Sequence, residues 1–434
     1  MIETYLRQYE ATAANGGSRA PDWVRSLRAD SIERFREAGF PGPKDEEWRF
    51  TPLAPLVRAN FGPAEAGAAV ILPEIEPFLF DRADWPRLVL VNGRFRADLS
   101  QLPPMPGVVV QNLEAAMAAD TGNLEAELVG SSARTATAFA SLNAALGQDG
   151  TVLRVADETV MEVPLHVVHV TTAGADNAAI HPKLLVIVGR EARAQLVESY
   201  VALAGAARYW TNAVSEVNVG EGAWVEHTRI QRESEAAFHT GLTEVRQARD
   251  SHYRSFAFAI GGAIARHDLR ARLGGPGAET LLYGLYLGRG DQLVDNHTTI
   301  FHDQPDCRSW EVYKGILGDR AHGVFSGKII VQPIAQKTDA KQTNRTLLLS
   351  DTARIDTKPQ LEIFADDVKC THGATVGNLD PMARFYLTSR GFPEAVARQV
   401  LTYAFAAEVL DEISAEPVKT ALDRLVHGRL GAGF

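Results

Sequence analysis

The order of apolar and polar residues divides the chain into three parts. In the first part, up to about residue 150, helical and extended patterns are mixed. Between residues 22 and 38 the apolar side chains cluster on one side at about 100° per residue, and Gly39 and Pro41 follow as stop signals. Similar signals predict helices at 114–119 and 134–146, and a hairpin from Leu88–Val91, Asn92-Gly93 and Arg94-Phe95. We expect residues 1–150 to form a helical and mixed region.

From residue 151 to residue 377, short extended runs replace the helical periodicity. The clearest runs are Val163–Thr171, Leu184–Val188, Trp224–Ile230, Thr280–Leu287 and Gly327–Val331. Small-residue turns separate them, most at intervals on the order of 30 residues. Many short strands with weak self-similarity are typical of a β-solenoid, in which each coil stacks on the last. This pattern alone leaves a β-sandwich as an equal alternative.

The last part, residues 378–434, returns to helical periodicity. Asp380-Pro381 predicts an N-cap followed by a first-turn proline, and Gly391-Phe392-Pro393 begins a second helix. A third helix is expected at about 417–429. The second helix carries an apolar stripe formed by Val396, Val400, Tyr403, Ala407 and Leu410. Such a stripe normally packs internally, but its position near the carboxyl end also makes it a candidate docking face.

Composition narrows the classes of protein. The chain has 434 residues, 45% hydrophobic and 23% charged, which is ordinary for a globular protein. A net charge of −10 argues against a general nucleic-acid binder. Two cysteines are too few for a disulfide framework, so a reducing compartment is expected. Neither a 20-residue apolar span nor a signal-peptide core is apparent, and we therefore expect a cytoplasmic protein outside the membrane.

The strongest chemical signal is a cysteine and a histidine two residues apart, Cys370 and His372. On an extended segment these side chains point to the same side, so a thiolate and an imidazole can face one acceptor. Both groups are ligands for zinc or iron, but two ligands make only half of a four-ligand site. Taken alone, the pair is more simply interpreted as a structural cysteine beside a hydrogen-bonded histidine.

The same segment resembles a known family. The run from Lys358 to Ile363, followed by Ala365-Asp366-Asp367-Val368-Lys369-Cys370 and His372-Gly373-Ala374-Thr375-Val376-Gly377, is similar to the signature of the SufB/SufD family of iron–sulfur cluster assembly scaffolds. The SufB branch lacks the Asp-Asp-Val-Lys-Cys-x-His run, so the resemblance is to the SufD branch. Other elements in family order are Asp45-Glu46-Glu47-Trp48-Arg49-Phe50-Thr51, Asn296-His297-Thr298, Cys307, Lys314-Gly315, Phe325-Ser326-Gly327, Lys337-Thr338-Asp339, Asn344–Leu348, Phe385-Tyr386-Leu387 and Ser389-Arg390-Gly391.

The resemblance implies a fold and a function. It implies a right-handed parallel β-helix core flanked by helical ends, which favours the solenoid over the sandwich. It also implies a scaffold subunit, not an enzyme, that pairs with SufB through the β-helix and binds the SufC ATPase through its carboxyl-terminal helices. In the family the residues matching Cys370 and His372 lie at the SufB interface, where a nascent Fe–S cluster is built, so both are candidate metal ligands. No cofactor is expected to bind the isolated chain tightly.

Other residues have simpler interpretations. Cys307 follows His302 closely, but Pro305 between them makes a turn, which favours a structural cysteine. His166 and His169 should lie on opposite faces of one strand, which argues against a joint site. Neither a Walker A sequence nor a dinucleotide-binding fingerprint is present.

Two rival functions stay open on the residues alone. One is a β-helix carbohydrate-active enzyme, which needs paired carboxylates in a groove. The other is a homodimeric metal-binding protein that uses Cys370 and His372 from both copies.

Overall fold

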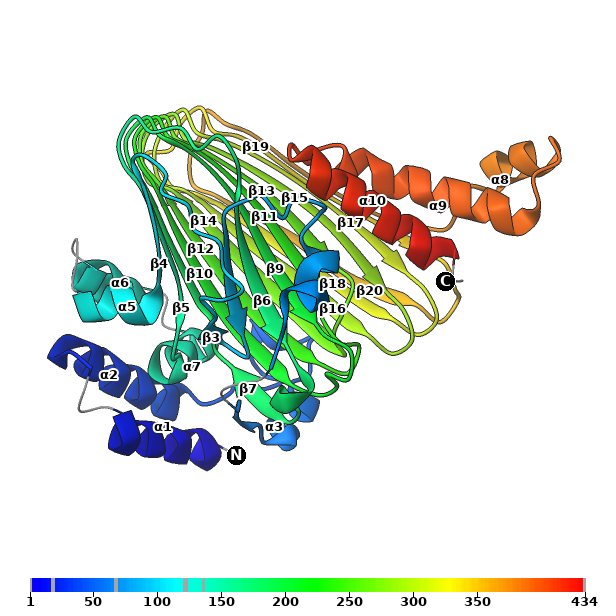
Figure 1. The fold of residues 1–434 in the computed structure, drawn as a ribbon. Coiled ribbons are helices and arrows are strands. Elements are labelled where there is room, and N and C mark those ends of the chain that lie inside the picture. The colour runs from blue at the N-terminus through cyan, green and yellow to red at the C-terminus, as the bar shows by residue number, and fades with distance from the viewer. Residues whose placement is uncertain (1, 17–19, 66–68, 120–123, 135–136, 432–434) are drawn as a thin grey trace.

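The core of the protein is a β-solenoid built from two parallel sheets (Figure 1). The computed structural model describes residues 2–16, 20–65, 69–119, 124–134 and 137–431. From residue 183 onward the chain alternates between the sheets, so that each strand pairs in parallel with the strand two further along. This pairing confirms the solenoid and excludes the antiparallel sandwich.

The two sheets have the following strands. Sheet A contains β5 (Gly150–Val155), β8 (Lys183–Val188), β10 (Trp210–Val219), β12 (Phe238–Gln247), β14 (Ile264–Leu273), β16 (Leu293–His302), β18 (His322–Val331) and β20 (Arg354–Ile363). Sheet B contains β6 (Leu165–Thr171), β9 (Arg193–Ala202), β11 (Trp224–Arg232), β13 (His252–Ala259), β15 (Glu279–Gly288), β17 (Arg308–Leu317), β19 (Asp339–Leu348) and β21 (Lys369–Gly377). The short β7 (Ala178–Ile180) pairs with β10 and with β1 (Gly62–Pro63).

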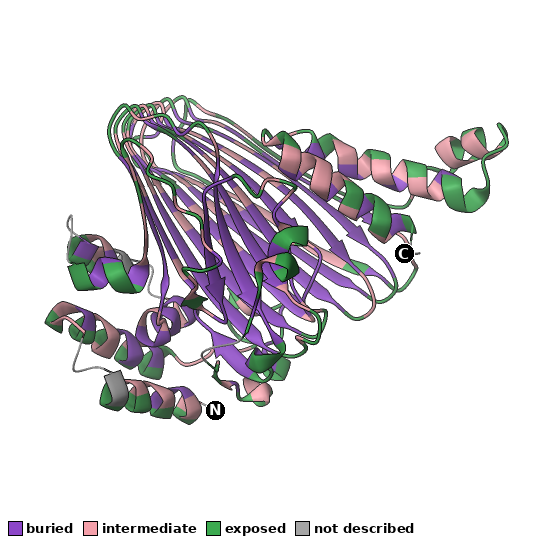
Figure 2. Cartoon of the chain, viewed as in Figure 1, coloured by how far each residue is buried: buried purple, intermediate pink, exposed green. Residues whose placement is uncertain are grey.

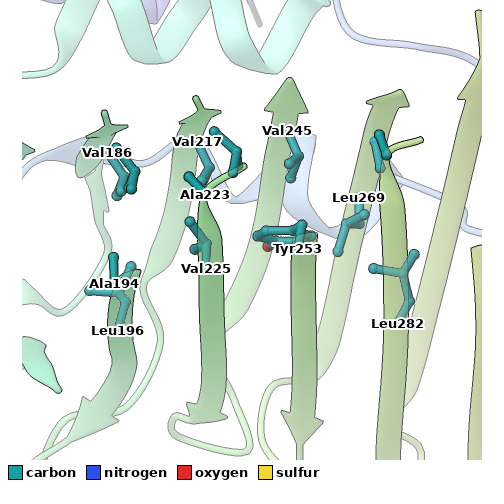
Figure 3. Close-up of a cluster of buried hydrophobic side chains, with 14 of the residues drawn as sticks. Val186, Ala194, Leu196, Val217, Ala223, Val225, Val245, Tyr253, Leu269 and Leu282 are labelled. Carbon is teal, nitrogen blue, oxygen red and sulfur yellow. The ribbon is translucent and has the colours of Figure 1, made fainter. Parts of the chain in front are cut away.

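Columns of aliphatic side chains hold successive coils together. One column in sheet A consists of register partners Val186, Val217, Val245, Ala271, Ile300, Ile329 and Leu361. They face residues of sheet B such as Val225 and Leu282 in one continuous interior cluster (Figure 3). Each buried Val, Leu or Ile contributes about 1.5–3 kcal/mol. A single coil cannot bury such a face alone, so the strands are stable only when they are stacked.

The amino-terminal region covers one end of the solenoid. Its helices are α1 (Ile2–Gly16), α2 (Asp22–Ala38), α3 (Ala54–Ala59), α4 (Leu72–Ile75), α5 (Leu113–Ala119), α6 (Leu124–Arg134) and α7 (Ala138–Leu146). Its strands β2 (Arg87–Val91) and β4 (Val108–Asn112) extend sheets B and A respectively. An aromatic cluster that includes Tyr5, Phe35 and Phe139 joins α1, α2 and α7 to Trp210 of β10.

Most predicted elements of this region are confirmed, with one correction. The helix at 22–38 is α2, and Gly39 follows it with a φ of 65°, a left-handed conformation that favours glycine. The hairpin is β2 with β3 (Arg94–Phe95), turned by Asn92 and Gly93, both with positive φ. The helix predicted from residue 134 is wrong at its start, because Arg134 ends α6 and the Thr137 side chain caps α7 by accepting from the Ala140 N–H.

The carboxyl-terminal helices pack on the outer face of sheet B. They are α8 (Pro381–Thr388), α9 (Glu394–Leu410) and α10 (Glu416–Gly431), close to the predicted positions. The Asp380 side chain caps α8 at the Met382 N–H, as expected. α9 and α10 bury residues such as Ala406 and Val426 against Phe258 and Leu285. α8 and the start of α9 project beyond the sheet and are only partly buried (Figures 1 and 2). None of the helices in the described part of the chain has the length and apolar character needed to cross a membrane.

Candidate functional site

The solenoid ends on two strands that have no neighbour on their outer side within the described ranges. β20 continues sheet A only through β18, and β21 continues sheet B only through β19. Most residues of β21 are exposed, and most of β20 are half-buried. The opposite end is closed by the antiparallel strands β3 and β4 and by the amino-terminal helices. Backbone N–H and C=O groups along an open edge can pair with a strand of another chain.

Cys370 and His372 lie on β21, at this open end. Cys370 is in register with buried Ala340 and packs against the interior apolar cluster, so its side chain faces into the solenoid. His372 is in register with Gln342 and, two residues along the strand, shares that face. Cys370 is half-buried and His372 is exposed. The structure therefore places thiol and imidazole on one face of the last coil, at its open edge.

The environment of Cys370 keeps its sulfur protonated in the isolated chain. Burial raises the pKa of the Cys370 thiol; the Ala340 backbone N–H lowers this pKa and the nearby Asp339 carboxylate raises it. Because the thiolate is the nucleophile and the metal ligand, a raised pKa makes a free Cys370 unreactive. A bound cation would displace this proton and convert the thiol into a ligand.

Cys370 and His372 do not form a closed metal site. Within the described residues, no group of three or more His, Cys, Asp or Glu side chains has an arrangement that could hold a metal ion. A tetrahedral site of thiolate and imidazole ligands needs four donors. Cys370 and His372 could supply two of these donors.

Asp366 and Asp367 lie in the loop before β21. Both carboxylates are exposed. The Asp367 backbone N–H donates to Gln336 Oε1 at 2.9 Å, and its carbonyl accepts from the Lys337 N–H at 2.6 Å. These backbone contacts of Asp367 join the turn before β21 to the turn of the coil beneath.

The interior behind the open end contains polar groups that the sequence did not predict. Glu311 on β17 and Gln342 on β19 are both 1% exposed, and Gln342 Nε2 donates to Glu311 Oε2 at 2.9 Å. Burial raises the pKa of Glu311 to about 7. A carboxyl group with this pKa is partly ionised at neutral pH, although its surroundings are fully buried.

A second buried polar cluster lies further inside. Glu198 accepts hydrogen bonds from Tyr200 at 2.7 Å and from His227 at 3.1 Å, and His239 lies 2.6 Å from Glu233. Burial opposes ionisation of Glu198, but the bonds from histidine outweigh it and hold its pKa well below the usual range. Polar side chains occur on both faces of β11, His227 and Arg229 inside and Glu226 and Thr228 outside, so its pattern gave no signal of a buried polar cluster.

The acidic–tryptophan element near the amino end folds onto the outer face of sheet A. The Arg266 guanidinium lies 3.7 Å from the centre of the Trp48 ring and donates to Asp295 at 3.0 Å. His297 lies between Glu47 and Asp295, 3.3 and 3.1 Å away. This clasp, formed by Glu47, Trp48, Arg266, Asp295 and His297, joins two of the motifs that carry the family resemblance. It extends to the open end, because Glu46 pairs with Lys358 of β20.

The projecting carboxyl-terminal helices present an exposed apolar face. Its members, with their exposed fractions, are Met382 (72%), Phe385 (66%), Tyr386 (55%), Phe392 (43%), Val396 (37%) and Val400 (42%). Lys314 of β17, only 1% exposed, fastens α9 to sheet B by donating to the Phe405 carbonyl at 2.9 Å and by pairing with Glu408. Val396 and Val400 of the exposed face thus lie on a helix that is attached to the solenoid, and the other members precede it in the chain.

The remaining candidate residues are structural. Cys307 is buried in the interior cluster, its thiol 3.4 Å from the Gly275 carbonyl, and burial raises its pKa to about 11. His302 contacts Ser309 at 2.9 Å. His166 bonds to Ser199 on the outer face of sheet B, whereas His169 stacks on Tyr200 inside. The two histidines therefore lie on opposite faces, as the spacing predicts.

Comparison with known proteins gives concordant matches along the chain. The model of the SufBD protein N-terminal region matches residues 1–167, and that of the SUF system FeS cluster assembly, SufBD core domain, matches residues 169–405. An iron–sulfur cluster assembly SufBD family protein of Synechocystis is 35% identical over 412 residues, which cover 93% of this chain and 90% of that protein. The iron–sulfur cluster assembly protein SufD of Escherichia coli is 32% identical over 422 residues, 97% and 95% of the two chains. SufD of Bacillus subtilis is 25% identical, with 94% of each chain covered. The chain belongs to the SufBD family of iron–sulfur cluster assembly proteins.

Proposed function

We propose that this chain is a SufD-type scaffold subunit of a cytoplasmic SufBCD complex. In this proposal it pairs with SufB through the open end of the solenoid, and a nascent Fe–S cluster is built at that junction. The observation that carries the proposal is that Cys370 and His372 lie on β21, at the end of the solenoid where the edges of both sheets are uncovered. Half of a ligand set lies where a second solenoid would have to dock.

The open end suits a partner of the same architecture. Strands from a second solenoid would pair with the free edges of β20 and β21, so each sheet would continue across the junction. Exposed apolar residues at this end, Phe364 at 61% and Val376 at 44%, would gain burial on pairing. The family resemblance supplies SufB as this partner, since SufB shares the β-helix.

At the junction the two side chains have different roles. His372 is exposed and offers a neutral imidazole nitrogen to iron. Cys370 lies deeper and binds iron or sulfur once its proton has been displaced. The cluster is the cargo of the site and leaves for an acceptor protein, so the chain itself performs no catalytic step.

The exposed apolar face of α8 and α9 is the proposed docking surface for SufC. ATP hydrolysis in SufC would then move α9, which Lys314 fastens to β17. β17 belongs to the same sheet as β21. A displacement of the docked ATPase is thereby transmitted to the sheet that carries Cys370 and His372. This movement of the sheet opens the junction for cluster assembly.

One alternative is a homodimer that uses Cys370 and His372 from two copies of this chain. The same open edges favour it, because a second copy also offers parallel strands. Anaerobic purification of the chain alone and together with SufB and SufC separates the two proposals. A complex containing SufB and SufC, with iron bound only when SufB is present, supports the scaffold. An iron-loaded homodimer that does not bind SufB supports the alternative.

Substitutions at β21 test the ligand roles. We expect His372→Ala to leave the complex with SufB and SufC assembled but to reduce cluster formation to a small fraction. Cys370→Ser should also impair cluster formation, because a hydroxyl is a harder and weaker ligand than a thiolate. The effect should be smaller than that of His372→Ala, because a donor oxygen remains at position 370. Thr371→Ala is the matched control, since Thr371 is in register with exposed Lys341 on the opposite face. Wild-type cluster formation by His372→Ala in an intact complex contradicts the ligand role.

A further inference from the structure

Three polar side chains stack along the solenoid axis and end at His372. Glu311 on β17 is the register partner of Gln342 on β19, and Gln342 is the register partner of His372 on β21. All three face inward, since Ala340 and Cys370, two residues before Gln342 and His372, belong to or pack against the interior cluster. The stack therefore leads from a fully buried carboxyl group to the open end.

The amide of Gln342 is oriented by Glu311. Gln342 Nε2 donates to Glu311 Oε2 at 2.9 Å, so the amide nitrogen lies toward Glu311. The acceptor of the amide, Gln342 Oε1, takes no part in this bond. This oxygen is buried and has no hydrogen-bond partner among the described residues. A buried acceptor left unpaired costs about 1–3 kcal/mol, so its persistence requires an explanation.

Gly327 provides the space for this amide. It lies on β18 of the facing sheet, and a Cβ at position 327 would be 2.0 Å from Gln342 Nε2 and 2.6 Å from its Cδ. These distances are far below van der Waals contact, and a side chain at position 327 would displace the amide. The interior is thus shaped to hold Gln342 in this orientation.

We propose that Gln342, oriented by Glu311, is a positioning residue for His372. Once the open end is covered by SufB, its Oε1, which is unpartnered in the isolated chain, accepts the N–H of one ring nitrogen of His372, and the other nitrogen is left unprotonated and directed at iron. A neutral imidazole has one donor and one acceptor nitrogen, and the partner of the donor decides which nitrogen binds metal. In metal sites such a partner is usual, and its loss typically costs 10–100-fold in affinity or activity. The inference rests on the proposed ligand role of His372.

Gln342→Met tests this role with little change of shape, because Met is unbranched and lacks an acceptor of comparable strength. The first readout is the ¹⁵N NMR tautomer of the His372 ring in the full-length chain in complex with SufB and SufC, assigned by its disappearance in His372→Ala. We expect one tautomer to dominate in the wild type and the two to become mixed in Gln342→Met. The second readout is cluster formation with SufB and SufC, expected to fall about 10–100-fold while the complex stays assembled.

Lys341→Met is the matched control. Lys341, the neighbour of Gln342 on β19, is exposed and lies on the opposite face of the strand, so the His372 tautomer should stay as in the wild type. If Gln342→Met does not fold, Gln342→Leu replaces it with the same expectation. An unchanged His372 tautomer in a folded Gln342 variant overturns the positioning role, even if cluster formation falls. Wild-type cluster formation by His372→Ala overturns the ligand role instead, so the two failures are distinguishable.

Discussion

His297 should stabilise the fold in its charged form, and the size of this effect follows from the clasp. Burial lowers the pKa of His297, but the charge of Asp295 and hydrogen bonds to Asp295 and Glu47 outweigh it and raise the pKa to about 9. The rise from the ordinary value of 6.5, at about 1.36 kcal/mol for each pKa unit, corresponds to about 3 kcal/mol. Because the pKa is raised in the folded state, this contribution is complete below pH 6.5 and disappears as the pH rises through 9.

The variant His297→Gln removes the charge and keeps a polar side chain. The linkage relation predicts that it lowers the free energy of unfolding by about 3 kcal/mol at pH 6, by about 2 kcal/mol at pH 7.5 and by almost nothing at pH 9.5. Urea unfolding of wild type and variant at the three pH values measures this difference. The control is His427→Gln, the same substitution at a largely exposed histidine outside the clasp. A loss that is equal at all three pH values, or a His297 titration midpoint below 6.5 by NMR, refutes the reasoning.

Two further predictions concern the interior and the docking face. Burial raises the pKa of Glu311 to about 7, so wild-type stability should fall as the pH rises from 4.5 through 7. Between pH 5 and pH 8, the free energy of unfolding of Glu311→Gln should therefore increase relative to that of the wild type by up to about 3 kcal/mol, as measured by urea unfolding. A difference that does not depend on pH would contradict the buried-carboxyl interpretation. On α8, the pair Met382→Asp and Phe385→Asp should abolish SufC capture without changing the melting temperature, whereas Ile71→Asp, at an equally exposed apolar site, should leave capture intact. Retained capture by the α8 variant would place the docking surface elsewhere.

Local pattern was sufficient for the elements of this fold. The helix at 22–38, the Asn92-Gly93 turn and the Asp380 cap were predictable, because capping, glycine conformation and helical period depend on residues close together in the chain. The motif around Cys370 and His372 likewise identified the family from consecutive residues. The start of α7 was missed because the Thr137 cap competes with an otherwise continuous helical pattern.

The sequence left the contacts between coils undecided. Glu198 meets His227 from the next strand of sheet B, and Trp48 covers Arg266 across more than 200 residues of chain. Isolated, His227 and Glu311 read as ordinary polar strand residues, and nothing local indicated that they are buried. Their burial, the stacking of Gln342 beneath His372 and the open edge of β21 all follow from which strands become register partners. That choice depends on burying whole aliphatic columns between coils, a collective free energy that no short segment contains.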